Sequence, residues 1–140
     1  MRGIRRQETG NTTGMSILEV SLVYLFGALG YGGIELLWRG RTHWTMLLLG
    51  GVCFCAIYAI TVFLHASLPW KWLLCAVVVT VLEFAAGCLV NLYLGWNVWD
   101  YGSLPGNILG QVCPAYAACW FLLSIPCSAL SQAIRRFLFS

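Results

Sequence analysis

Four long apolar segments, separated by short polar stretches, constrain the fold of this chain more than any other feature. They cover about residues 16–38, 44–64, 70–95 and 107–130. As a helix, each segment is long enough to cross a hydrocarbon core of about 30 Å. Only 9% of the residues are charged, whereas soluble domains carry about 25%, so the chain cannot build a water-facing surface. The sequence therefore predicts an all-α, polytopic membrane protein that folds as a bundle of four transmembrane helices.

The two ends of the chain and its longest connection are more polar than these spans. Residues 1–14 are basic and rich in Gly, Asn and Thr, which predicts a disordered tail lying against anionic lipid headgroups. Residues 15–131 are expected to form a single transmembrane domain, and residues 132–140 a basic amphipathic C-terminal tail. Residues 96–106 are too polar for the bilayer centre and too aromatic for open water. We expect them to form an outer interfacial loop between the third and fourth helices.

Proline positions indicate where the fourth helix begins and where it bends. Pro105 and Asn107 suit a helix start. Pro114 and Pro126 would then lie inside the helix and kink it, which a membrane bundle tolerates when neighbouring helices satisfy the freed carbonyl groups.

Basic residues are distributed unevenly between the two sides of the predicted bundle. Four spans place both termini on one side, and six of the eight Lys and Arg residues fall on that side. The positive-inside rule then predicts a multi-pass protein of the cell membrane with both termini in the cytoplasm. The six are Arg2, Arg5, Arg6, Lys71, Arg135 and Arg136, and the remaining two are Arg39 and Arg41.

Glu83 is a carboxylate in the middle of the third apolar segment. It lies thirteen residues from both Trp70 and Trp96, which places it about 20 Å from either end of a helix and near the bilayer midplane. An ionised carboxylate there costs at least about 2.5 kcal/mol, so it must be protonated, paired or facing water. Because burial favours the neutral form of a carboxyl group, proton exchange is chemically available. We expect Glu83 to be functional, with a protonated structural acid as the alternative.

Other polar residues at compatible depths extend this candidate substrate- or ion-binding site. Glu83, Gly87 and Asn91 are spaced by four and share one helix face, where Gly87 would leave a gap for a ligand or another helix. Asn91 and Gln111 are expected to meet at a similar depth, and Arg41 would help to form a lid above them. The full candidate set is Glu83, Asn91, Gln111, Glu35, Asp100, Arg39, Trp99, Tyr101 and Asn107.

Most of these residues also have a purely structural interpretation. Glu35 and Arg39 are four apart and can form an interfacial ion pair. Asp100 can be a solvated or turn-forming loop residue. Asn91 and Gln111 can be interhelical hydrogen-bond partners without a ligand. Both interpretations stay open at the level of sequence.

Several residue types that often indicate other chemistry do not do so here. The seven cysteines lie inside apolar runs without a CxxC motif, and the two histidines are not clustered, so neither a metal nor another cofactor is expected. No spacing of a nucleophile and a base supports an enzyme. Nucleic-acid binding has no support beyond three N-terminal arginines, which lipid explains better. Glu19, close to the cytoplasmic end of the first span, is expected to reach water and is left out of the site.

Two blocks of the sequence carry a family resemblance. The first is the run GGIELLWRGRTHW, which covers residues 32–44. The second combines Trp99-Asp100-Tyr101 with Pro105, Asn107, Gly110, Cys113 and Trp120. Across about residues 20–125 they resemble the small bacterial membrane proteins labelled as ABC-transporter permeases, type IV. The resemblance implies a permease component with a separate ATPase subunit, since the chain has no P-loop motif of its own.

Two functions therefore remain in view. The first is a small transporter or permease component in which Glu83 binds a proton or cation. Four spans are thin for enclosing a pathway, so a homo-oligomer in the lipid bilayer is expected. The alternative is a non-transporting accessory subunit, assembly factor or scaffold whose polar residues only stabilise the bundle.

Overall fold

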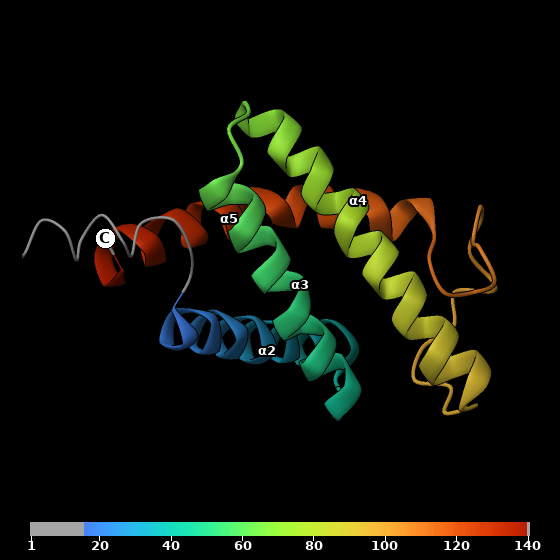
Figure 1. The fold of residues 1–140 in the computed structure, drawn as a ribbon. Helices are drawn as coiled ribbons and strands as arrows, with labels where there is room; N and C mark the ends of the chain where they lie inside the picture. The colour runs from blue at the N-terminus through green and yellow to red at the C-terminus, as the bar shows by residue number, and fades with distance from the viewer. Residues whose placement is uncertain (1–15, 140) are drawn as a thin grey trace, which may run out of the picture.

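The computed structural model describes residues 16–139, and four long helices make up most of them (Figure 1). The helices are α2 (Ile17–Arg39), α3 (Trp44–Phe63), α4 (Leu68–Gly87) and α5 (Pro114–Leu138), and α4 continues into the short π-helix η1 (Cys88–Tyr93). Four spans, with α4 and η1 counted together, are long and apolar enough to cross a membrane. The predicted all-α bundle is confirmed, whereas the predicted tail at residues 1–14 lies outside the described residues.

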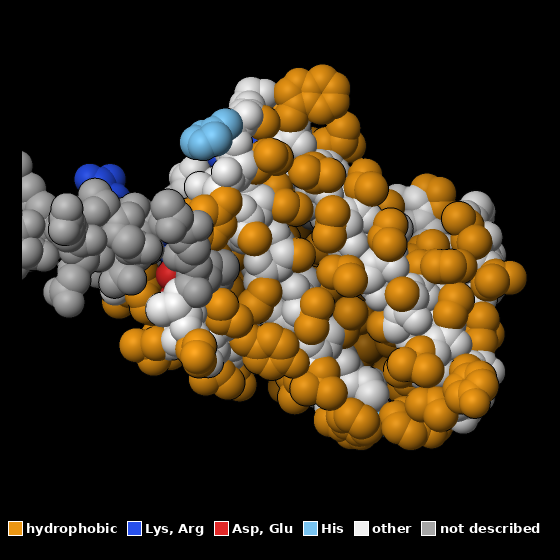
Figure 2. Space-filling view, in the orientation of Figure 1, with side chains coloured by type: hydrophobic (Ala, Val, Ile, Leu, Met, Phe, Trp, Pro, Cys, Tyr) orange, Lys and Arg blue, Asp and Glu red, His pale blue; other side chains and the backbone are white. Residues whose placement is uncertain are grey.

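The two ends of the bundle differ in what they carry. The terminal end carries Ser16, the turn at residues 64–67 and the end of α5, whereas the loop end carries the turn at residues 40–43 and a long loop at residues 94–113. α3, α4 and α5 pack against one another, and α2 packs on α3. Hydrophobic side chains cover the face that α3 and α4 present in Figure 2, as a lipid-facing surface requires.

An open seam separates α2 from α5. Among the described residues, no Cα atom of α2 lies within 8 Å of a Cα atom of α4 or α5. Side chains bridge the seam instead, and the rings of Tyr31 on α2 and Trp120 on α5 stack with their centroids 5.6 Å apart. α2 is therefore held to the rest of the bundle by α3 and by a small number of side-chain contacts.

The close approach of α2 to α3 depends on glycine. A Cβ atom on Gly27 would collide with the Cβ of Phe54 and would lie 2.8 Å from the carbonyl oxygen of Gly50. Gly30, one turn further along α2, has open space at the same position, with no heavy atom within 4 Å. Small residues allow helix backbones to approach closely in lipid, so Gly27 marks the contact face of α2 and Gly30 does not.

This difference predicts opposite effects for two identical substitutions. Alanine at either position gains up to about 1 kcal/mol of helix propensity. At Gly27 this gain is outweighed, because forcing a methyl group into a packed contact costs about 1–3 kcal/mol. We expect Gly27→Ala to lower the midpoint of thermal unfolding in detergent and Gly30→Ala to leave it unchanged or raise it. Equal midpoints for the two variants would contradict this packing.

The fourth helix begins later than the sequence predicted. The prediction placed its start at Asn107, but α5 begins at Pro114, so Pro114 occupies the first helical turn and does not kink the helix. The preceding residues cannot be helical, because Gly106, Leu109 and Gly110 have φ angles of 71°, 53° and 72°. The loop expected between the third and fourth helices is present and longer than expected, and it covers residues 94–113.

α5 also extends further toward the C-terminus than expected. The fourth span was predicted to end near residue 130, but the helix continues without a break through Leu138, and Pro126 lies inside it as predicted. Residues 132–138 of the predicted tail are therefore part of α5. The physical reason is a contact that the sequence did not indicate, an ion pair between Arg135 and Glu19 that holds this end of α5 against α2.

Candidate functional site

Glu83 is buried in α4, with 1% of its surface exposed. Its Oε1 accepts a hydrogen bond of 2.9 Å from the hydroxyl of Tyr101, and its Oε2 accepts one of 2.8 Å from the indole Nε1 of Trp120. One donor comes from the loop and the other from α5, so the carboxyl group joins three parts of the structure. No described basic side chain pairs with it. Both oxygen atoms are held by neutral donors.

Tyr101 is fixed on both sides of its ring. The ring stacks on Tyr116 of α5 with a centroid separation of 4.6 Å, and the backbone N–H of Tyr101 donates to the carbonyl of Gly110 over 2.7 Å. Burial, and then the neighbouring carboxyl of Glu83, raise the pKa of the Tyr101 hydroxyl well above its usual value. The hydroxyl therefore stays protonated and available as a donor at neutral pH.

The predicted meeting of Asn91 and Gln111 is confirmed. Asn91 lies in η1, and its Nδ2 donates to Oε1 of Gln111 over 2.8 Å. Its Oδ1 accepts from the backbone N–H of Val98 at 2.7 Å. Trp99, which is 4% exposed, donates its indole N–H to the backbone carbonyl of Gln111 over 3.1 Å. These contacts fasten the loop onto η1.

The gap expected at Gly87 is not open to a ligand. A Cβ atom there would collide with Oε1 of Gln111 and would lie 3.0 Å from the ring of Trp99. The loop folds back into the space that the glycine leaves, so Gly87 serves close packing of the protein on itself. The notch at Gly87 was predicted correctly, but the loop fills it in place of the expected ligand or neighbouring helix.

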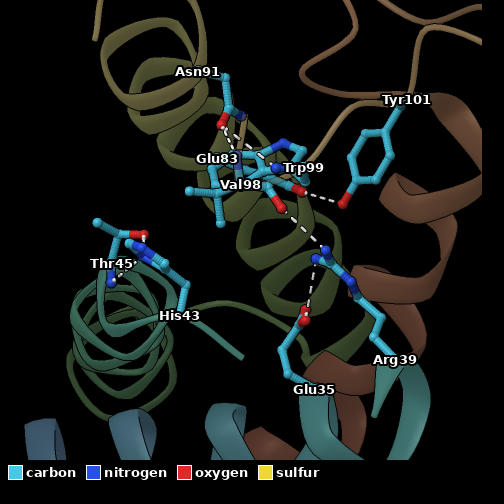
Figure 3. A network of polar contacts seen from close by, with 9 residues as sticks. All are labelled: Glu35, Arg39, His43, Thr45, Glu83, Asn91, Val98, Trp99 and Tyr101. Carbon is cyan, nitrogen blue, oxygen red and sulfur yellow. Dashed lines mark hydrogen bonds and ion pairs between the residues drawn. The ribbon is translucent and has the colours of Figure 1, made fainter. Parts of the chain in front are cut away.

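Glu35 and Arg39 form the expected ion pair on α2. The distance from Nη1 of Arg39 to Oε2 of Glu35 is 3.3 Å. Nη2 of Arg39 also donates to the backbone carbonyl of Val98 over 3.0 Å, which connects α2 to the loop. Figure 3 shows Glu35 and Arg39 reaching toward Val98, while the side chain of Tyr101 points to Glu83. The pair therefore stands next to the Glu83 network without contacting it directly.

Asp100 and Asn107 hold the loop in shape. Oδ1 of Asp100 accepts from the backbone N–H of Gly102 over 2.8 Å, the contact of a turn-forming aspartate. Asn107 donates to the carbonyl of Leu104 at 2.8 Å and accepts from the N–H of Gly110 at 3.0 Å. Of the residues proposed from sequence, these two have a clear structural role within the loop.

Glu35 borders three adjoining cavities. The largest, called the loop cavity below, has a volume of about 410 Å³ and is lined on its polar side by Glu35, Arg39, Arg41, Asn97, Asp100 and Ser103. The seam cavity, about 310 Å³, lies between α2 and α5 and is mostly apolar. A third cavity of about 160 Å³ lies beside His43. Glu83 lines none of them, and Tyr101 stands between it and the two larger cavities. Within residues 16–139, no three His, Cys, Asp or Glu side chains are grouped as metal ligands.

Comparison with protein families matches residues 33–139 to the family described as "Putative ABC-transporter type IV". The match covers more than half of the chain and includes the residues from Glu35 to Trp120 that surround the cavities. The chain belongs to the ABC-transporter type IV family. This confirms the resemblance drawn from the two sequence blocks. No curated protein and no solved structure matches the chain.

This ABC-transporter type IV protein has a second buried carboxylate, which the sequence reasoning missed. Glu19 was expected to reach water, but only 3% of its surface is exposed. Nη1 of Arg135 lies 2.6 Å from its Oε1, and the hydroxyl of Tyr58 donates to the same oxygen. The guanidinium of Arg135 also lies 5.2 Å from the ring centroid of Phe63. The sequence feature that could have indicated this ion pair is Arg135, which lies at the same end of the predicted bundle as Glu19.

Proposed function

We propose that this protein is the membrane-embedded permease component of a transporter, not an enzyme, and that Glu83 is its proton- or cation-binding acid. The observation that carries the proposal is the position of Tyr101. Its ring lines the loop and seam cavities, while its hydroxyl donates to Glu83. A buried acid is thereby one side chain away from cavities that can hold a solute, and Trp120, its other donor, also lines the seam cavity.

The two donors to Glu83 respond differently to a proton. The indole of Trp120 can only donate, so Oε2 must remain an acceptor in either protonation state. A proton is therefore accommodated on Oε1, where the hydroxyl of Tyr101 can turn and accept. Tyr101 then directs its own hydrogen elsewhere. In this proposal, binding of a proton by Glu83 turns the hydroxyl of Tyr101 and so changes the hydrogen-bonding groups that the cavities present.

The proposal also covers the location and orientation of the protein, its oligomeric state and its partner subunit. The distribution of basic residues supports a cell-membrane protein with both termini in the cytoplasm. Gly30 and Gly33 leave open space on α2, which suits a second copy of the chain in a homo-oligomer. A separate ATPase subunit, as the family description implies, would dock at the terminal end.

The alternative is an accessory subunit or scaffold without transport. The observation that favours it is the complete satisfaction of both oxygen atoms of Glu83 by donors within the chain. Under this alternative Glu83 never releases or binds a proton during function, and removing its charge changes nothing except stability.

Glutamine at position 83 separates the two possibilities. Its carbonyl oxygen can accept from Trp120 and its amide can donate to Tyr101, so both hydrogen bonds are kept while ionisation is lost. We expect Glu83→Gln to reduce proton flux by about 100-fold, the range associated with loss of a proton-transferring group. The assay uses proteoliposomes with an entrapped pH dye and a potassium diffusion potential.

The matched control for this assay is Gln132→Glu on the exposed side of α5. It makes the reverse change, from an amide to an acid, far from the site. It should leave the flux at the wild-type level. Wild-type flux equal to that of empty liposomes, or equal flux for wild type and Glu83→Gln, would contradict the proposal.

A further inference from the structure

We propose that the loop cavity and the seam cavity form one binding site for a phospholipid, with an acyl chain in the seam and the phosphate against Arg41. This names the class of molecule that the proposed permease takes up, and for that role it rests on the proposed function. Binding itself is a separate property and is tested separately.

The two cavities adjoin each other. Both are lined by Glu35, Trp38, Tyr101 and Tyr116. Their volumes are about 310 and 410 Å³, and each falls within the range of about 300–1,000 Å³ typical of ligand pockets. A mostly apolar compartment thus lies directly beside a polar one, which is the arrangement that an amphiphile requires.

The apolar compartment is open to the bilayer. Ile34 of α2 and Leu122 of α5 line the seam cavity and are 45% and 64% exposed. The backbones of α2 and α5 stay more than 8 Å apart among the described residues, so an acyl chain can enter sideways from the membrane. Such entry keeps the chain in apolar surroundings throughout, because it never crosses water.

One of the two arginines that line the polar compartment has no ion-pair partner among the described residues. Arg39 is occupied by Glu35 and by the carbonyl of Val98. Asp100 is engaged by the N–H of Gly102. Arg41 lines the same cavity, and no hydrogen bond or ion pair joins it to another residue of the described chain. A phosphate group offers several acceptor oxygen atoms, and the planar guanidinium of an arginine can donate to two of them at once.

The first test is lipid selection by native mass spectrometry of the purified full chain. Phosphatidylglycerol and diacylglycerol with identical acyl chains are added in equal amounts, and the bound fractions are compared. We expect the phospholipid to be retained about tenfold better, the value of one charge-assisted hydrogen-bonded contact. Arg41→Gln should remove this preference. Arg136→Gln, an exposed arginine at the opposite end, should keep it. Equal retention of both lipids, or an unchanged preference in Arg41→Gln, would overturn the assignment.

The second test concerns the acyl chain. Cys119 lines the seam cavity and is exposed, so Cys119→Trp should fill the seam and lower phospholipid retention by about tenfold through lost apolar burial. Cys119→Ala should retain the lipid. Leu130→Trp, on an exposed part of α5 outside the cavity, is the control for added bulk. Full retention in Cys119→Trp would mean that the lipid only coats the bundle surface, and it would overturn the proposal.

The outcome also separates this proposal from the proposed function. Glu83→Gln should keep the preference for phosphatidylglycerol over diacylglycerol, since Arg41 is unchanged and Glu83 does not line either cavity. Selective lipid binding without proton flux would leave the lipid site standing and remove the permease role. Proton flux without lipid selection would remove the lipid site alone.

Discussion

Replacing Arg135 with glutamine is expected to lower the free energy of unfolding by about 3–5 kcal/mol, because it leaves the Glu19 carboxylate buried without its counter-ion. Glu19 is 3% exposed and lies 2.6 Å from the guanidinium of Arg135. The hydroxyl of Tyr58 remains as a donor, but a neutral group cannot offset a full charge in hydrocarbon. Since this contact also joins α5 to α2, its loss should loosen the seam at the terminal end.

The measurement is reversible unfolding in mixed micelles, with Arg136→Gln as the control at the neighbouring, exposed position. The double variant Glu19→Gln with Arg135→Gln should recover much of the lost stability, since no charge is then stranded. If Arg135→Gln is as stable as Arg136→Gln, Glu19 has access to water and its assigned burial is wrong.

The second large effect is expected from Glu83→Leu. Leucine fills the site with apolar atoms but leaves the indole N–H of Trp120 and the hydroxyl of Tyr101 without their acceptor, and each buried unsatisfied donor costs about 1–3 kcal/mol. Glu83→Gln keeps both hydrogen bonds and should stay within about 1 kcal/mol of the wild type. Two substitutions at one position thus separate the structural contribution of Glu83 from its ionisation.

Thermal unfolding in detergent gives the stability of both variants. Tyr101→Phe is the matched partner, because it removes one donor to Glu83 and keeps the ring that stacks on Tyr116. A leucine variant as stable as the glutamine variant would show that the two hydrogen bonds contribute nothing to the fold.

The sequence was sufficient for the spans because apolar length is a local property. The first two helices begin and end within two residues of their predicted bounds. The start of α5 was misplaced because Pro105 and Asn107 look like a helix start by composition. The positive φ of Leu109, a residue that rarely adopts it, belongs to a tight turn that is closed by hydrogen bonds from Ile108 to Val112 and from Gln111 to Ile108.

The candidate site was only partly predictable for the same reason. The central position of Glu83 in its span follows from helix geometry, which the sequence carries. The pairing of Asn91 with Gln111 was predicted with Gln111 on the fourth helix, whereas Gln111 lies in the loop that precedes α5. The residues that donate hydrogen bonds to Glu83 could not be identified from the sequence, since Tyr101 is 18 and Trp120 is 37 residues away along the chain. Glu19 was misjudged because its partner Arg135 is 116 residues away. Long-range side-chain pairing decides whether an acid in a membrane helix is a buried group or a surface one.

The central claim is that Glu83 exchanges a proton through its contact with Tyr101. Infrared difference spectroscopy of the protein in liposomes, recorded between acidic and alkaline pH, detects the carbonyl stretch of a protonated carboxyl group directly. We predict a band that appears and disappears reversibly in the wild type, is absent in Glu83→Gln and is displaced in Tyr101→Phe. A spectrum in which wild type and Glu83→Gln show the same carboxyl bands across the whole pH range would contradict the claim.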